Sequence, residues 1–551
     1  MRTARLLKPA CACRAVTTEE QDIPDYDGIV IGGGHNGLTA AAYLSRAGQK
    51  VAVLEGNAEI GGGTATEEST LPGHRHNLHA NFFMGLGHAP MMRDLELQRY
   101  GFSYIEPEVQ QAGTFRDGSC VVIHQDLDKT CASLARFSKR DADTFRDLYQ
   151  RYVIEMRPLL VSLLYNAPLA LDQLRDLLSG PKAKEFLGHA EHDLFSVVAN
   201  YFDDERIRTL FTSYMHVITT ENVPGSGMVF PGIFANVTGF TLPVGGAVSY
   251  PLACGRIVAA GGGAVRINAR VREITVSGAR AVGVVLDDGT KLTAGRFVAS
   301  AIDTPTTVAM VGRELFDDAI NEKLDNWHWG NHSLVTLHLA LKQAPVYKAR
   351  EFDPDIDHAF NIFFGMDDLE QVHKCFEDCE ENIFPDVLMG NGACNSSFDP
   401  SYAPAGRHSA FWWPFAPYAV DGDAMNWDER REDYTRRVLD VWREYAPNLD
   451  DENVDATFLY TPLDIERQTA NMIRGAVRMG AYIPSQLGTN RPHPDISGTR
   501  TPIEGLYICG SGVGNGGGMN GAPGYIVANA IVEDFDLERD WTPVAPPEWR
   551  S

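Results

Sequence analysis

The 551-residue sequence predicts an α/β protein whose two domains are interleaved along the chain. Three observations lead to this prediction: a strand–helix–strand pattern near the N-terminus, a strand and a helix that flank a glycine-rich loop near the C-terminus, and a block of short strand patterns between them. A chain of this length exceeds what one hydrophobic core supports, so two or more domains are expected. The segments between the three patterns should build a second, α+β domain of a mixed sheet and helices.

The N-terminal pattern consists of an apolar strand over 28–31, an Ala-rich helix over 36–47 and a second strand over 50–54. The loop between the first strand and the helix carries a GxGxxG sequence. This order of strand, glycines, helix and strand is the βαβ unit of a Rossmann-type domain.

The three glycines of this loop each meet a requirement of dinucleotide binding. Gly32 permits the tight turn, Gly34 lets the backbone approach a pyrophosphate, and Gly37 allows the helix to pack closely on the strand. The helix N-terminus adds free N–H groups for the anion. Glu55 ends the second strand, where it can accept both ribose hydroxyls. Its charge repels a 2′-phosphate, so NADP is not expected.

Two further glycine-rich turns favour a flavin over a nicotinamide. The turn Gly61–Thr64 follows Glu55 closely and could pass the chain beneath the pyrophosphate and ribityl of a flavin dinucleotide. Near the C-terminus, an apolar strand over 506–509 leads into residues 510–524, eight of which are glycine, and then into a helix over 525–532. Such a loop presents bare N–H groups to a flavin ring edge.

These motifs, together with the middle block over 243–301, resemble the FAD-dependent amine oxidase superfamily and, within it, the phytoene desaturase (carotenoid oxidoreductase)-like branch. The resemblance covers roughly half of the chain, and it implies FAD as the cofactor. It implies that FAD contacts the following residues: Gly32, Gly34, His35, Asn36, Gly37, Glu55, Gly62, Gly63, Thr64, Val271, Gly510, Ser511, Gly518, Met519 and Asn520.

Two departures from the branch bear on the substrate. Carotenoid desaturases usually carry His-Pro inside the terminal glycine run, where this chain has Gly514 and Asn515. Arg478 and Met479 stand where relatives tend to have an aromatic residue and a histidine. A polyene substrate is therefore not expected. An arginine near the ring could instead pair with a carboxylate or another polar group.

The resemblance also divides the chain. The FAD-binding domain comprises 25–112, 239–307 and 470–540, the substrate-binding domain comprises 113–238 and 308–469, and 1–24 and 541–551 are tails, the first one disordered. Helical spacing in the substrate segments predicts helices over 141–164, 171–178, 183–190, 203–215, 314–327 and 428–445, and alternation predicts strands over 332–341 and 409–414.

Four residues are candidates for catalysis: His79, His76, Arg478 and Asn515. The histidines lie in a polar stretch that passes close to the ring in the family, and imidazole titrates near neutral pH, so His79 or His76 could act as a base or orient substrate. They could equally bond backbone in a polar loop. Arg478 could contact flavin or substrate, or form a structural ion pair. Asn515 could donate a hydrogen bond to the flavin or its substrate.

The sequence therefore predicts an FAD-dependent oxidoreductase that removes hydrogen from a C–C or C–N bond of a small or medium organic substrate by hydride transfer to flavin N5. Oxygen, a quinone or another carrier would reoxidise the flavin. Two alternatives stay open. One is a redox-neutral hydratase or isomerase that uses reduced FAD on a double bond, and the other is a flavin-binding protein without enzymatic activity.

Composition excludes several other classes. A net charge of −25 opposes nucleic-acid binding, which requires a basic surface. No apolar run is long enough for a transmembrane helix. The nearest stretch, 153–175, predicts core-facing helical turns, with a membrane-surface or lipophilic patch as the alternative. Nine cysteines show no disulfide framework, and the pair Cys375 and Cys379 lacks the second pair of a zinc site, so no metal is expected. The cytoplasm is the expected location. Mitochondria are the alternative if the basic N-terminus is a presequence.

Overall fold

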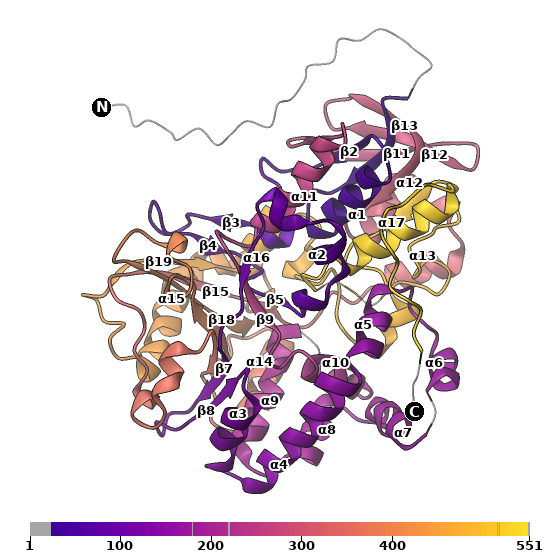
Figure 1. The fold of residues 1–551 in the computed structure, drawn as a ribbon. Coiled ribbons are helices and arrows are strands. Elements are labelled where there is room, and N and C mark those ends of the chain that lie inside the picture. The colour runs from indigo at the N-terminus through magenta and orange to yellow at the C-terminus, as the bar shows by residue number, and fades with distance from the viewer. Residues whose placement is uncertain (1–23, 179, 219–220, 515, 517, 549–551) are drawn as a thin grey trace, which may run out of the picture.

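The computed structural model describes residues 24–178, 180–218, 221–514, 516 and 518–548, and two large sheets organise this part of the chain (Figure 1). The predicted tail over 1–24 lies outside the described residues except for Pro24. The first sheet has seven strands, in the order β10-β2-β1-β13-β12-β11, with β20 also paired to β13. Their bounds are β1 Tyr26–Ile31, β2 Val51–Leu54, β10 Ala264–Arg266, β11 Val271–Ser277, β12 Arg280–Leu286, β13 Lys291–Ser300 and β20 Leu506–Ile508.

Strand β13 joins the parallel part of the first sheet to its antiparallel part. Its second half pairs in parallel with β1 and β20, which places Val298 beside Ile29 and Leu506. Its first half pairs antiparallel with β12. The parallel strands are apolar throughout because helices cover them, as βαβ connections require. Segments from the beginning, middle and end of the sequence therefore meet in one sheet, as interleaving requires.

Helix α1 (His35–Arg46) packs against both α11 (Ser249–Ala260) and α17 (Ala522–Asp534) over this sheet (Figure 1). Glycines make the approach close. A Cβ added to Gly37 would lie 2.1 Å from the Gly32 carbonyl oxygen, and one added to Gly524 would lie 2.1 Å from that of Asn36. The absence of side chains at these two positions therefore fixes how α1 sits on β1 and against α17. Helices α12 (Thr304–Val311) and α13 (Asp318–Asp325) follow β13.

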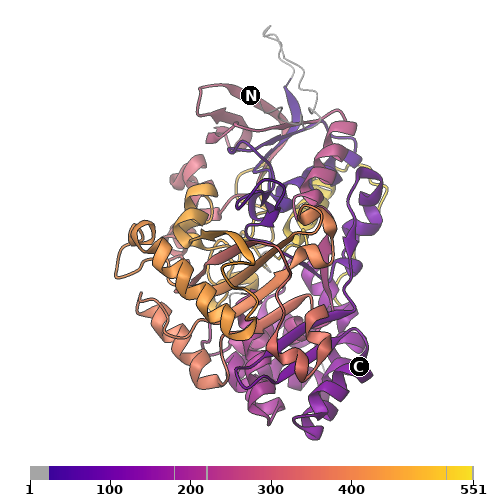
Figure 2. The same ribbon diagram turned by 90° about the vertical axis from the view of Figure 1, so that its left-hand side faces the viewer.

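The second sheet has eight strands in the order β19-β15-β18-β17-β16-β7-β8, with β14 paired to β18. Their bounds are β7 Val109–Thr114, β8 Cys120–His124, β14 Ser333–Leu334, β15 Thr336–Leu341, β16 Asn361–Phe364, β17 Gly390–Cys394, β18 His408–Ala416 and β19 Val454–Tyr460. Helix α15 (Asn426–Tyr445) lies across this sheet, and α14 (Leu369–Glu380) and α16 (Pro462–Gln468) flank it (Figure 2). Strand β7 begins before the predicted domain boundary at residue 113.

The helix-rich segment forms the lower part of the molecule in Figure 1. Its helices are α3 Leu127–Ala135, α4 Lys139–Leu148, α5 Arg157–Tyr165, α6 Leu171–Leu177, α7 Pro181–Gly188, α8 Leu194–Tyr201, α9 Glu205–Ile218 and α10 Phe230–Phe234. The predicted helix over 141–164 is divided, because a π-helical turn over Tyr149–Glu155 separates α4 from α5. Smaller elements complete the fold: α2 Pro90–Asp94, β3 Thr66–Glu67, β4 His76–Asn77, β5 Phe83–Met84, β6 Tyr104–Ile105 and β9 Phe240–Pro243.

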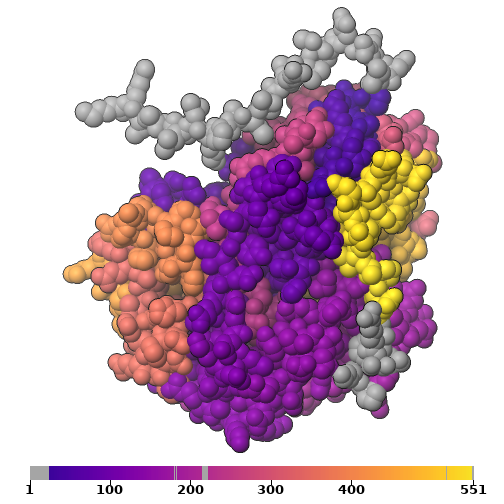
Figure 3. Space-filling model, viewed as in Figure 1, coloured from indigo at the N-terminus to yellow at the C-terminus, as the bar shows by residue number. Residues whose placement is uncertain are grey.

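Residues 541–548, predicted as a tail, pack on α1, α17 and α5, and Figure 3 shows the C-terminal region in yellow on the surface of the molecule. The Trp541 ring meets Tyr43 of α1 edge-on, with centroids 4.9 Å apart. The Val544 N–H donates to the Tyr525 hydroxyl at 2.8 Å, and the Ala545 carbonyl accepts from Ser162 of α5. This segment therefore connects α1, α17 and α5. Among the described residues, no helix is long and apolar enough to cross a membrane.

Candidate active site and cofactor site

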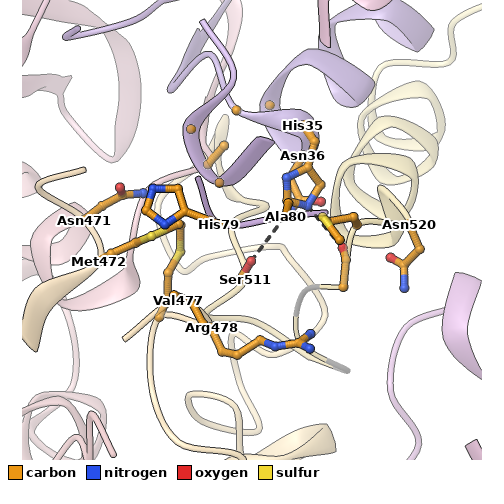
Figure 4. Close-up of a pocket in the computed structure, with 18 of the residues that line it drawn as sticks. His35, Asn36, His79, Ala80, Asn471, Met472, Val477, Arg478, Ser511 and Asn520 are labelled. Carbon is orange, nitrogen blue, oxygen red and sulfur yellow. Dashed lines mark hydrogen bonds between the residues drawn. The ribbon is translucent and has the colours of Figure 1, made fainter. Parts of the chain in front are cut away.

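A cavity of about 560 Å³ runs between the two sheets and collects residues from both (Figure 4). One end is formed by the glycine loop after β1, the end of β2 and the start of α12. The other end is formed by α5, α10, the second sheet and the segment over 469–482. The site therefore depends on the interleaved topology, since neither domain contains all of its walls.

Bare backbone forms the cradle at the first end. The loop after β1 and the turn after β2 cross at a bridge between Gly34 and Gly61. A Cβ added to Gly62 would lie 3.3 Å from the Gly34 Cα, so the two strands of backbone are nearly in contact. A Cβ added to Gly34 would meet nothing closer than 3.8 Å, because this glycine faces the cavity. The N-terminus of α1 points its free N–H groups at the same space.

Glu55 lies 9% exposed on the cavity wall and is held in place by backbone. One carboxylate oxygen accepts from the Gly33 N–H at 2.8 Å and the other from the Asn57 N–H at 2.8 Å. Each oxygen keeps a second lone pair for a ribose hydroxyl. Val271, which the resemblance implies as an FAD contact, lines the same cavity.

Among the described residues of the cavity wall, at least three buried polar atoms have no hydrogen-bond partner. They include the Oδ1 of Asn36, the Nδ1 of His79 and the Oδ2 of Asp303. Buried polar atoms are almost always hydrogen-bonded, so three such atoms along one cavity indicate a ligand with several polar groups. Burial raises the pKa of Asp303 to about 6. The bare glycine cradle and these atoms fit an extended dinucleotide.

The C-terminal glycine segment closes over the loop that follows β1. His35 Nε2 lies 3.1 Å from the Gly518 carbonyl oxygen, and Asn36 donates to the Ser511 hydroxyl at 3.5 Å (Figure 4). Tyr165 of α5 donates its hydroxyl hydrogen to the Asn520 carbonyl at 3.0 Å. These contacts bring the two motifs that are most distant in the sequence to one wall of the cavity.

Of the two candidate histidines, only His79 lines the cavity. Its Nε2 lies 3.4 Å from the Tyr460 hydroxyl, and in Figure 4 it lies beside Asn471 and Met472. Burial lowers its pKa to about 4, so the ring is neutral at physiological pH. His76 is outside the wall: its Nε2 lies 2.8 Å from the Thr70 hydroxyl, and its ring packs on His338 with centroids 4.8 Å apart.

Arg478 lines the cavity and extends toward the Asn520 segment (Figure 4). A Cβ added to Gly518 would lie 3.8 Å from Arg478 Nη1 and 3.1 Å from Asn520 Nδ2, so both side chains lie near this glycine. The Arg478 guanidinium also stacks on Tyr482 at 5.2 Å. Its position places a positive charge where the cradle ends and the apolar part of the cavity begins.

Arg491, which no sequence motif marks, lies behind this part of the cavity wall and holds its backbone in place through hydrogen bonds. The side chain is fully buried and donates to carbonyl oxygens in two segments, at 2.8 Å to Ser511, 3.0 Å to Gln486 and 2.6 Å to Arg478. It also stacks on Tyr482 and Trp327. Burial lowers its pKa to about 10. No sequence motif marks it, because its partners are backbone atoms that only the fold brings together.

Beyond Arg478 most of the cavity wall is apolar until its outer end, where Arg157 and His88 line it. Apolar side chains from six parts of the chain form this chamber: Phe82, Met84, Leu160, Val161, Leu163, Leu164, Met228, Val229, Ile233, Leu334, Trp413 and Val477. The only carboxylates on the described cavity wall are Glu55 and Asp303, both at the cradle end. A molecule in the chamber therefore meets hydrocarbon and aromatic surface, with His79 and Arg478 at its inner end.

Most predicted site residues lie on this one cavity. The wall includes Gly32, Gly34, His35, Asn36, Gly37, Glu55, Gly62, Gly63, His79, Val271, Arg478, Ser511, Gly518, Met519 and Asn520. Thr64, Gly510 and His76 are not on it: Thr64 donates to the Gly61 carbonyl at 2.7 Å, and Gly510 packs against the Ile302 backbone. Asn515 lies outside the described residues. Asp303, missed by the sequence analysis, follows the carboxyl end of a parallel strand, where ligands of such sheets bind.

Fold and site define a dinucleotide-binding α/β protein with an apolar chamber next to the cofactor. Comparison with known families then matches residues 37–531 to the flavin containing amine oxidoreductases. The chain belongs to this family. It is an FAD-dependent oxidoreductase.

Three known proteins illustrate the relationship. A limonene dehydrogenase subunit of Castellaniella defragrans is 33% identical over 543 residues, which cover 95% of this chain and 97% of the relative. The lycopene-forming phytoene desaturase of a Paracoccus species is 28% identical over 278 residues, half of each chain. Putrescine oxidase bound to putrescine has the same fold, with a TM-score of 0.59 and 16% identity over 92% of this chain and 99% of its own. The predicted superfamily is confirmed, whereas the resemblance to phytoene desaturases is distant and partial.

Proposed function

We propose that this enzyme dehydrogenates a carbon–carbon bond of a largely apolar substrate. The observation that carries the proposal is the composition of the chamber wall. On the chamber side of Arg478, the described wall offers hydrocarbon and aromatic contacts and no carboxylate. An alkylammonium ion would lose its hydration there without gaining a negative partner, which is unfavourable. An uncharged C–H donor meets no such penalty. Similarity to the limonene dehydrogenase of Castellaniella defragrans, whose name gives a hydrocarbon substrate, supports the same choice.

The cofactor supplies a two-electron acceptor when bound, and the chain supplies position and charge. The substrate loses a hydride from one carbon and a proton from its neighbour, which leaves a C=C bond. We assign the proton to His79, whose neutral ring lies on the chamber wall with one nitrogen unpartnered. Arg478 is assigned to the cofactor, since its guanidinium lies near Gly518 and can balance negative charge there. The hydrogen bond from Asn515 to the flavin or its substrate stays a prediction.

Anaerobic mixing of the FAD-loaded enzyme with an alkene, a carboxylate of similar size and an alkylamine of similar size tests the proposal. We expect the flavin absorbance to be lost with one of the first two compounds and to persist with the amine. Faster bleaching by the amine would contradict the C–C assignment. Conversion of an alkene only by pre-reduced enzyme, with the flavin still reduced afterwards, would favour the hydratase or isomerase alternative. Stopped-flow reoxidation with oxygen or a quinone then identifies the acceptor.

We also propose the cytoplasm as the location, with mitochondria as the alternative. Seven cysteines fall among the described residues and all are free thiols, which is typical of a reducing compartment. Cell fractionation with antibody detection distinguishes the two compartments, and recovery from an oxidising compartment would contradict both.

A further inference from the structure

The chamber wall contains a periodic row of side chains along α5. Arg157, Leu160, Val161, Leu164 and Tyr165 all line the cavity, and their spacing of three and four residues places them on one face of the helix. Tyr165 at the end of this row bonds the Asn520 carbonyl, next to the cofactor site. Arg157 starts the row, about 12 Å away along the helix axis.

Arg157 contacts the exposed His88, which places it at the mouth of the chamber. His88 and Gly232 line the cavity and are exposed, and Met228 is 36% exposed. Trp413 and Phe82, by contrast, are 4% and 3% exposed at the inner end. The face of α5 therefore runs from an arginine at the solvent end, across apolar side chains, to the cofactor segment.

Arg157 has only neutral partners. Its guanidinium donates to the Ala235 carbonyl at 3.1 Å and to His88 Nε2, which accepts only if that nitrogen carries no hydrogen. Among the described residues, no carboxylate pairs with Arg157. Burial lowers its pKa. A half-buried cation without a negative partner is unusual in a chain with a net charge of −25.

We propose that Arg157 binds the carboxylate of an amphiphilic substrate whose apolar chain extends along α5 to the cofactor. This inference rests on the proposed function, which takes the inner chamber as the place where the substrate meets the cofactor. A guanidinium provides paired donors in the geometry that a carboxylate accepts, and the ligand would supply the missing negative charge. Leu160, Val161 and Leu164 would contact the chain of the ligand, and its length would place carbons near His79.

The experiment uses the FAD-loaded full chain and two ligands that differ only in the head group, laurate and dodecanol. Binding is measured by calorimetry and by perturbation of the flavin spectrum, so turnover is not required. We expect laurate to bind the wild type more tightly than dodecanol by about tenfold or more, because one charge-assisted pair is gained. Arg157→Met should remove this preference, and Arg157→Lys should restore part of it.

Arg436→Met is the matched control, since Arg436 is 73% exposed on α15 and pairs with Asp433 away from the cavity. It should keep the laurate preference. Equal binding of laurate and dodecanol to the wild type, or an unchanged preference in Arg157→Met, would overturn the proposal. In that case, reduction of the flavin by an uncharged alkene would still support the proposed dehydrogenation. Conversely, laurate binding that depends on Arg157, without flavin reduction by any compound of the anaerobic experiment, would support carboxylate binding by Arg157 and contradict the proposed dehydrogenation.

Discussion

At the residue scale, two charged side chains at the cofactor site are held by backbone groups and not by opposite charges. Glu55 accepts from two backbone N–H groups, and Arg491 donates to carbonyl oxygens of two segments that line the cofactor site. The sequence identifies Glu55 because a strand and a glycine motif precede it. Arg491 has no such context, so its role emerges only when the fold brings residues 478–486 and 511 around it.

Arg491→Met should destabilise the protein strongly and weaken FAD binding. The substitution leaves several buried carbonyl oxygens without donors, and each unsatisfied buried group costs about 1–3 kcal/mol, so a loss of about 3 kcal/mol or more is expected. Urea unfolding followed by flavin fluorescence measures both effects. Arg436→Met serves again as the exposed control. A variant that unfolds within about 0.5 kcal/mol of the wild type would contradict this role, since that is the range of ordinary surface substitutions.

At the element scale, the β1–α1 unit agrees with its prediction almost residue for residue. The sequence predicts the first strand, the helix and the second strand over 28–31, 36–47 and 50–54, respectively. The structure places them at Tyr26–Ile31, His35–Arg46 and Val51–Leu54. Local sequence suffices here because glycines, apolar runs and a terminating Gly48 act within the unit. The segment 141–164 shows the opposite case, because its helical periodicity does not reveal the π-helical turn that separates α4 from α5.

Two glycines of this unit should respond differently to substitution. Gly34→Val should leave the apoprotein folded but weaken FAD binding by more than about tenfold, because the added atoms point into the cradle. Gly37→Ala should instead destabilise the fold by about 1–3 kcal/mol, because its Cβ meets backbone of the same unit. Thermal unfolding without FAD and titration with FAD separate the two effects. Normal FAD affinity in Gly34→Val would rule out this cradle.

At the scale of the whole molecule, burial makes several histidines neutral. It lowers the pKa of His35, His79 and His332 to about 4 and that of His76 to about 3. The unfolded chain binds these protons near pH 6.5, whereas the folded chain does not until about pH 4. Stability should therefore fall as the pH falls from 6.5 toward 4. Asp303 opposes this trend, because its raised pKa lets the folded chain bind a proton at a higher pH than the unfolded chain does.

His332→Phe should flatten this dependence. The ring of His332 packs edge-on against Phe376 and Phe415, so an aromatic replacement preserves the contacts and removes the proton. The slope of unfolding free energy between pH 4.5 and 6 should fall by up to about 1.4 kcal/mol per pH unit. The exposed His192, changed to Gln, is the control and should leave the slope intact. An identical slope in both variants would show that His332 does not contribute.

The sequence by itself determined the cofactor, the superfamily and the interleaved α/β plan, because nucleotide binding depends on glycines and a carboxylate at fixed spacings within short segments. It also marked most residues of the cavity wall. Only the tertiary structure decided which histidine reaches the cavity, which arginine supports the site from behind, and that α5 lines the chamber with Arg157 at its mouth. Those properties depend on contacts between segments far apart in the chain, and no local spacing encodes them.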